Sequence, residues 1–167
     1  VTFNIPVKVD VLDADGVFAL NAGIGGSGAL EKRGPGTLLL GGADPNTYPG
    51  DTLATDGTLW LSKPDGVQAT TNLIVNFPAR LRWGGSEQIA DAATLRLSNA
   101  DVFMTNHNET ITHLTMVDGD SSLVASSGVL TLLGDVDLDN STVFGNYNSI
   151  SATLRLGPGA HLVFNAN

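Results

Sequence analysis

The stretch EKRGPGTLLLGG, residues 31–42, places three consecutive leucines between two glycine-rich segments, and a near copy, TDGTLWLSKPDG, occupies residues 55–66. In the first copy, Gly34-Pro35-Gly36 predicts a tight corner, because proline fixes its own φ and glycine adopts conformations closed to other residues. We expect a positive φ at one or both of these glycines. After the corner, alternation points Leu38 and Leu40 toward an interior. The stretch therefore predicts a short strand that starts at a corner.

Segments of the same kind, a turn residue followed by alternating apolar positions, recur along the whole chain. They begin at residues 36, 57, 71, 79, 93, 113, 128, 135, 152 and 161. A period of two sends one set of side chains to a single face of each strand. We expect this set to form the core: Leu38, Leu40, Leu59, Leu61, Leu81, Trp83, Leu95, Leu97, Leu130, Leu132, Leu154 and Leu156.

The strongest segments recur every 16 to 24 residues, which is typical of one coil of a parallel β-solenoid with two or three short strands. Asp-Gly pairs at residues 15, 56, 65 and 118 leave an antiparallel sandwich or meander open, since such pairs mark hairpins. We favour the solenoid: an all-β, single elongated domain over residues 1–167, with on the order of seven or eight coils at ~4.8 Å each. Residues 86–95, SEQIADAATL, are the one candidate helix, and we interpret them as a loop or single turn leading into a strand at residue 94.

The composition limits the partners. The chain has a net charge of −9, which argues against binding to nucleic acid or an anionic membrane surface but is compatible with a cation. It contains no cysteine, so neither a disulfide nor a thiolate site can form, and this suits a bacterial secreted surface protein. No apolar run approaches the roughly 20 residues of a membrane-spanning helix, and the first ten residues lack the pattern of a signal peptide. Because the chain starts at Val1 rather than methionine, we expect a processed product or a part of a larger protein.

Residues 26–62, GSGALEKRGPGTLLLGGADPNTYPGDTLATDGTLWLS, resemble the autotransporter-associated β-strand repeat, also called the passenger-associated transport repeat. That repeat reads G-x-G-x-L-x-K-x-G-x-G-T-L-x-L-x-G, then Asn-x-Tyr-x-Gly, a threonine and G-x-L. The matching residues are Gly26, Gly28, Leu30, Lys32, Gly34, Gly36, Thr37, Leu38, Leu40, Gly42, Asn46, Tyr48, Gly50, Thr52, Gly57 and Leu59. Asp44 and Pro45 depart from the pattern, in a loop. Residues 101–136 resemble, more loosely, the N-x-x-E-T-I-x-x-L module that often follows such repeats.

The resemblance covers about 70 of the 167 residues. It implies a right-handed parallel β-helix in the exported passenger part of a large bacterial outer-surface or secreted autotransporter protein. It implies no reaction, because in such proteins the repeat is thought to assist export and to form a stalk. From the resemblance we expect an extracellular or cell-surface location.

Two groups of aspartates are candidates for carboxylate chemistry or for a cation. They are Asp135, Asp137 and Asp139, and Asp10, Asp13 and Asp15. The first group alternates with apolar residues on one strand, so a solvated face is a simpler interpretation than a site for a cation or a sugar. The second loosely resembles a calcium loop but lacks its D-x-D-x-D-G spacing and closing glutamate, so we interpret it as a turn.

The remaining candidates are basic. His107, His113 and His161 lie far apart and form no H-E-x-x-H or H-x-H pattern, so we interpret them as surface or turn residues rather than metal ligands. Arg80 and Arg82 could bind an anionic glycan, although ion pairs with acids on adjacent coils are the simpler interpretation. Glycosylation sequons at residues 108–110 and 140–142 are expected to be unmodified if the chain is bacterial.

We found no pair of carboxylates with a basic partner, no phosphate loop and no nucleophile elbow. The sequence therefore predicts a non-catalytic structural or adhesive β-solenoid segment, with no cofactor and no metal. The alternative is a β-helix module that binds or cleaves glycans, and a glycan or cell-surface partner is compatible with either.

The two ends and one face predict self-association. Both ends of the sequence are strand-like, and we see no cap to cover the unpaired backbone groups of an end coil. On the side, Leu39, Trp60 and Ile74 are expected to point outward and to form a short apolar stripe. We expect copies to associate by end stacking first and through the stripe second, and end stacking would build fibres.

Overall fold

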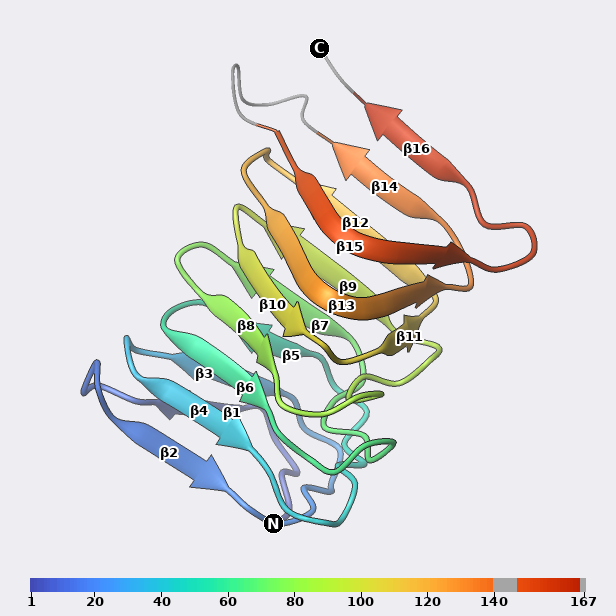
Figure 1. Ribbon diagram of the computed structural model, residues 1–167. Helices are drawn as coiled ribbons and strands as arrows, with labels where there is room; N and C mark the ends of the chain where they lie inside the picture. The colour runs from blue at the N-terminus through green and yellow to red at the C-terminus, as the bar shows by residue number, and fades with distance from the viewer. Residues whose placement is uncertain (140–146, 166–167) are drawn as a thin grey trace.

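The computed structural model describes residues 1–139 and 147–165. In this part of the chain there are sixteen β-strands, and no helix long and apolar enough to cross a membrane is found there. Figure 1 shows the strands stacked along one axis, with β1 and β2 at one end and β15 and β16 at the other. The fold is an all-β parallel solenoid of about seven turns, which confirms the predicted fold class over the antiparallel alternatives.

Two parallel sheets form the sides of the solenoid. Sheet 1 consists, in order, of β1 (Val7–Asp10), β3 (Leu30–Arg33), β5 (Thr52–Ala54), β7 (Leu73–Asn76), β9 (Thr94–Ser98), β12 (His113–Val117), β14 (Val136–Asp139) and β16 (Leu162–Asn165). Sheet 2 consists of β2 (Val17–Leu20), β4 (Thr37–Leu40), β6 (Thr58–Leu61), β8 (Arg80–Trp83), β10 (Asp101–Thr105), β11 (Glu109–Ile111), β13 (Ser122–Leu132) and β15 (Ser149–Leu156). The chain thus alternates between the sheets, coil after coil.

Each strand pairs in register with the strand of the next coil. Register partners follow each other at intervals of 19 to 26 residues in sheet 1 and 20 to 27 residues in sheet 2. The long strand β13 pairs with β10 along its first part and with β11 along its last, and β15 continues the stack beyond it. Residues about one coil apart in the sequence therefore become neighbours in space.

The core fills the space between the two sheets. The eight leucines predicted to line a continuous lumen are all fully buried: Leu38, Leu40, Leu59, Leu61, Leu95, Leu97, Leu130 and Leu132. Leu81 and Trp83 continue the same rows and are buried too. Complete burial of a leucine side chain contributes about 1.5–3 kcal/mol, so these stacked rows are the main source of stability.

The prediction for the last coil is wrong. Leu154 is only partly buried, and Leu156 is 43% exposed. The alternation is correct, since Leu132 and Leu156 are register partners, but β15 pairs only with β13 among the described residues, so no further strand covers its row. The first coil behaves in the same way: Phe18, the register partner of Leu38, is 47% exposed.

The predicted corner is present at Gly34, which has a φ of +75°. A Cβ atom at Gly36 would lie 2.3 Å from the carbonyl oxygen of Asp13, because the preceding coil passes directly beneath the corner. Gly57, one coil later, has a φ of +62° and is equally crowded, by the carbonyl oxygen of Gly36 at 2.4 Å. Residues 86–93 form the predicted loop, with one isolated bridge at Ile89, and β9 begins at Thr94 as predicted.

Candidate functional site

The outward side chains of sheet 2 form two parallel rows. In each short strand the first and third residues point away from the core, and in-register pairing aligns them from coil to coil. Row 1 contains Val17, Thr37, Thr58, Arg80 and Asp101. Row 2 contains Ala19, Leu39, Trp60, Arg82 and Phe103. The rows bring together residues that are more than eighty positions apart in the sequence.

The predicted apolar stripe is only partly correct. Leu39 and Trp60 are neighbours in row 2, but Ile74 lies on sheet 1, between Leu53 and Arg96. The prediction that all three form one stripe is wrong because consecutive apolar segments of the chain alternate between the sheets. A period of two fixes which side chains point outward, but not which sheet carries them.

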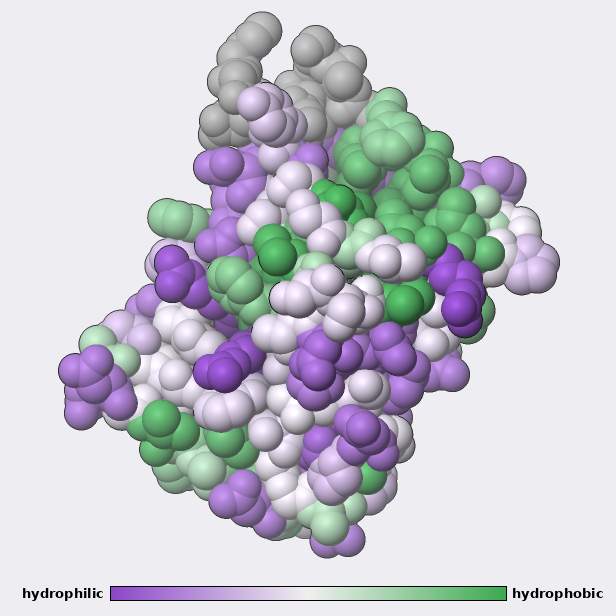
Figure 2. Space-filling model, viewed as in Figure 1, coloured by the Kyte–Doolittle hydropathy of each residue, from purple (hydrophilic) through white to green (hydrophobic). Residues whose placement is uncertain are grey.

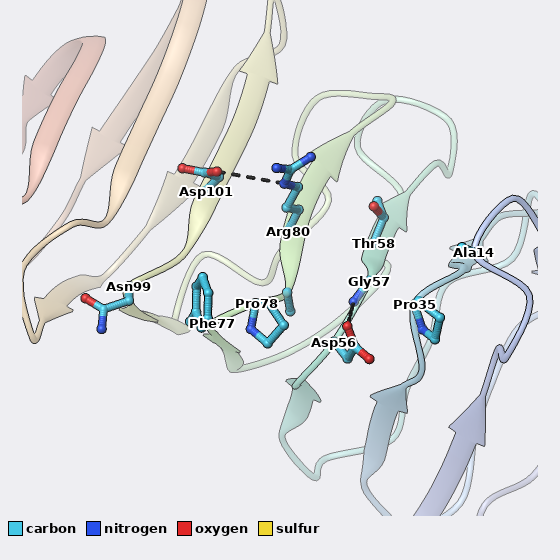
Figure 3. Close-up of a pocket in the computed structure, with 11 residues that line it drawn as sticks. Ala14, Pro35, Asp56, Gly57, Thr58, Phe77, Pro78, Arg80, Asn99 and Asp101 are labelled. Carbon is cyan, nitrogen blue, oxygen red and sulfur yellow. Dashed lines mark hydrogen bonds and ion pairs between the residues drawn. The ribbon is translucent and has the colours of Figure 1, made fainter.

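Two adjoining hollows follow row 1. The corner hollow, of about 370 Å³, lies along the turns that lead into sheet 2 and is lined by Asp56, Thr58, Pro78, Arg80 and Asp101, among others. Figure 3 shows these side chains arriving from successive strands. The basic hollow, of about 350 Å³, lies over the face of sheet 2 between the two rows. Thr58 and Arg80 line both hollows, so the two hollows adjoin along row 1, and we refer to them together as the groove.

The basic hollow holds two arginines and no carboxylate. It is lined by Val17, Thr37, Thr58, Trp60, Arg80, Arg82 and Phe103. The Arg82 guanidinium lies over the Trp60 ring, with its Cζ atom 4.3 Å from the ring centroid, which is a cation–π arrangement. No carboxylate of the described residues lies within ion-pair distance of Arg82. Its N–H groups therefore remain available to an acceptor.

Arg80 has only a loose partner. Its Nε atom lies 3.8 Å from Asp101 Oδ2 (Figure 3), and the two side chains are 63% and 41% exposed. The predicted ion pair with an adjacent coil is thus present, but an exposed pair at this distance contributes little. Asp101 also accepts a 2.6 Å hydrogen bond from the Ser122 hydroxyl, which fixes the position of its carboxylate. Arg80 can therefore turn from Asp101 toward another anion at small cost.

Asp135 forms a local cluster with His113 and His161. Asp135 Oδ1 lies 3.1 Å from His161 Nδ1, and His113 Nδ1 accepts a hydrogen bond from the Asp135 amide at 3.3 Å. Hydrogen bonds from His161 hold the pKa of Asp135 below its usual value. Asp137, by contrast, is exposed on the outer face of β14, as the solvated-face interpretation predicts. The coil spacing brings together two histidines that the sequence pattern treats as unrelated.

The other polar candidates are turn and surface residues. Asp13 Oδ1 accepts the Asp15 amide at 3.1 Å and its carbonyl accepts the Gly16 amide at 2.9 Å, which confirms a turn at this point. Asp10 instead pairs with Arg33 at 3.2 Å. Among residues 1–139 and 147–165, no three His, Asp or Glu side chains are arranged to hold a metal ion.

His107 and the two sequons are the remaining candidates from the sequence. His107 lies in the loop between β10 and β11, where its amide donates to the carbonyl of Met104. In the first sequon, Asn108 is exposed and its side-chain oxygen accepts the Val129 amide at 2.9 Å. The second sequon, at residues 140–142, lies outside the described residues.

Glu109 is a buried acid that the pattern did not single out. Its Oε2 atom accepts hydrogen bonds from Trp83 Nε1 at 2.7 Å and from the Gln88 amide at 2.8 Å, and the Ile89 amide adds a longer one at 3.3 Å. Burial raises the pKa of Glu109 to about 7, against the effect of these hydrogen bonds and with a smaller contribution from Glu87. The signal in the sequence was its place at an inward position of a strand, in the N-x-x-E-T-I segment.

Two lysines are also buried, and both donate hydrogen bonds to backbone carbonyls. Lys32 Nζ donates to the carbonyls of Arg33, Gly34 and Asp56, at 2.9, 2.5 and 2.9 Å. Lys63 Nζ donates to two carbonyls of the preceding coil, both at 2.7 Å. Burial lowers the pKa of each lysine. These side chains join successive coils, so they hold the corners rather than a ligand.

The comparisons with known proteins give no further guide to function. No family model, no curated protein and no solved structure matches this chain.

Proposed function

We propose that this chain is a non-catalytic structural and adhesive segment of an exported bacterial surface protein, and that copies of the solenoid associate end to end. The exported, cell-surface assignment is supported by the resemblance of residues 26–62 to the passenger repeat of autotransporters. The association is supported by the two end coils, which are the observation that carries the proposal.

Both end coils expose apolar side chains at inward positions, whereas the inward side chains of the coils between them are buried. At one end Phe18 is 47% exposed, and at the other Phe164, the register partner of Leu138, is 65% exposed. Figure 2 shows hydrophobic surface gathered over the end that carries β15 and β16, with a smaller area over β2 and more polar surface between them. Contiguous apolar surface of this kind marks interaction sites.

The strand edges at the two ends also support the proposal. β1 and β2 each pair on one side only, as do β15 and β16 among the described residues. Their free N–H and C=O groups are a template for a further parallel strand. A second copy placed head to tail supplies such strands with the same spacing, and its own end row covers the exposed one. The occupant we propose is therefore another copy of this chain.

Sedimentation velocity over a micromolar concentration series tests the proposal. We expect oligomers that grow with concentration, and we expect Phe18→Glu or Phe164→Glu to reduce them, because each puts a charge into the end face. Trp60→Glu is the matched control on the side of the solenoid and leaves end stacking intact. A chain that stays monomeric at all concentrations contradicts the proposal, as does association that only Trp60→Glu abolishes.

A further inference from the structure

We propose that the groove along rows 1 and 2 of sheet 2 binds an acidic glycan, with a uronate carboxylate held between Arg80 and Arg82. This deepens the adhesive part of the proposed function by naming a ligand class and a site. It rests on residues in the middle of the solenoid and does not depend on end stacking.

The charge distribution selects an anion for one part of the groove. Of the eight Lys and Arg residues, Lys8 and Arg33 are paired with acids, and Lys32 and Lys63 are buried at corners. Among the described residues Arg82 has no such partner, and Arg80 has only the loose pair with Asp101 at 3.8 Å. Both face the same carboxylate-free hollow from successive outward positions of one strand. A guanidinium stacked on an indole, as Arg82 is, keeps the N–H groups at its edge free to bind a planar carboxylate in a bidentate manner.

The rest of the lining suits a sugar. Trp60 and Phe103 border the basic hollow, and aromatic rings pack against the apolar C–H face of a pyranose. The hydroxyls of Thr37 and Thr58 add groups that both donate and accept hydrogen bonds. In the adjoining corner hollow, the carboxylates of Asp56 and Asp101 are acceptors for sugar hydroxyls but would repel a second ligand carboxylate. The groove thus favours an acidic unit on the side over the sheet face and neutral hydroxyls on the side along the turns.

The backbone beneath the groove argues against an extended peptide. β4, β6 and β8 are each paired with a neighbouring strand on both sides, so around Arg80 and Arg82 no free strand edge is present to accept a peptide by strand addition. A ligand must bind through side chains on the sheet face. From Val17 to Phe103 the groove crosses five coils, a length of about 19 Å at the spacing of parallel strands, which accommodates several sugar units.

Isothermal titration of the purified chain with polygalacturonate oligomers tests the inference. We expect binding that weakens with added salt, and a loss of about tenfold or more in affinity in Arg82→Gln and in Arg80→Gln. Arg155→Gln is the matched control, because Arg155 is exposed on β15, outside the groove, and loses the same charge. Trp60→Phe keeps a ring under Arg82 and should bind nearly as well as the wild type, whereas Trp60→Ala should bind weakly. Thermal unfolding of each variant confirms that it is folded.

Two further ligands decide the ligand class. Methyl-esterified polygalacturonate has the same rings without the charge, and we expect it to bind at least tenfold more weakly. Polyglutamate has the charge without the rings, and tighter binding to it than to polygalacturonate overturns the inference in favour of an acidic peptide. No binding by the wild type, or equal losses in Arg82→Gln and Arg155→Gln, also overturns it. Repeating the titration with Phe18→Glu, which blocks one end face, separates failure of the groove from failure of end stacking.

Discussion

The buried carboxyl group of Glu109 makes stability depend on pH in a direction opposite to that of an ordinary ion pair. Its pKa is about 7 in the folded chain, against a usual value of 4.5. Between these values the folded chain keeps the proton while the unfolded chain has lost it. Stability therefore falls as pH rises through this window, and the loss is complete above the folded pKa.

The magnitude follows from the size of the shift. At 1.36 kcal/mol per pKa unit, the difference between 4.5 and about 7 corresponds to about 3 kcal/mol of unfolding free energy. The variant Glu109→Gln removes the titration and keeps a side-chain oxygen that can accept from Trp83 Nε1. Urea unfolding at a series of pH values, for wild type and variant, gives the difference curve that isolates Glu109 from the other titrating groups, including the neighbouring Glu87.

Trp83 provides a second readout. The chain has two tryptophans, so Trp60→Phe leaves Trp83 as the single tryptophan, which can be excited selectively, and its indole N–H donates directly to Glu109. We expect its fluorescence to titrate with a midpoint near pH 7, and Glu109→Gln in the same background to abolish that step. A difference curve that is flat between pH 4.5 and 7, or one that rises with pH, refutes the reasoning.

Three further predictions concern stability. Leu59→Ala, in the fully buried middle of the lumen, should lower the unfolding free energy by about 2–5 kcal/mol in urea unfolding, whereas the same change at the partly exposed Leu53, on the outer face of β5, should cost less. Gly36→Val should unfold or severely destabilise the chain, since its Cβ would lie 2.3 Å from the Asp13 carbonyl oxygen. A melting temperature equal to that of wild type contradicts the close packing of the preceding coil against this corner. Asn46→Ala should cost about 1–3 kcal/mol, because the Asn46 side chain joins the Ile24 amide at 2.9 Å to the Ala69 carbonyl at 2.7 Å across two coils; an unchanged urea midpoint argues against that link.

The sequence predicts the lumen well because alternation reports directly on which side chains face inward. It predicted Leu38 through Leu132 correctly and failed at Leu156, where burial depends on whether a strand follows, and alternation carries no such information. The corner at Gly34 was predictable because glycine and proline have local conformational preferences.

The candidate groove was less predictable, because it depends on register. Arg80 and Arg82 were identified as a pair, but Trp60 was assigned to an apolar stripe, and nothing local indicates that it lies under Arg82. For the same reason, the sequence did not predict the contacts of His113 and His161 with Asp135 or the hydrogen bond from Trp83 to Glu109. Each joins residues about one coil apart, and the coil length varies between 19 and 27 residues.

Head-to-tail stacking in register is the central claim, and disulfide cross-linking tests it most directly. The row that contains Ala19 at one end of sheet 2 runs through Trp60 and Val124 to Ser151 at the other end. Because the chain has no native cysteine, Ala19→Cys with Ser151→Cys provides the only two thiols. In stacked copies these two positions become register neighbours across the junction.

Under mild oxidation we expect a ladder of reducible multimers for the double variant. Each single variant can form only dimers. A pair moved to sheet 1 at one end, Lys8→Cys with Ser151→Cys, should give little product, since these positions belong to different sheets. Failure of the double variant to form multimers, with both thiols shown to be reactive, or an equal ladder from the mismatched pair, contradicts in-register end stacking.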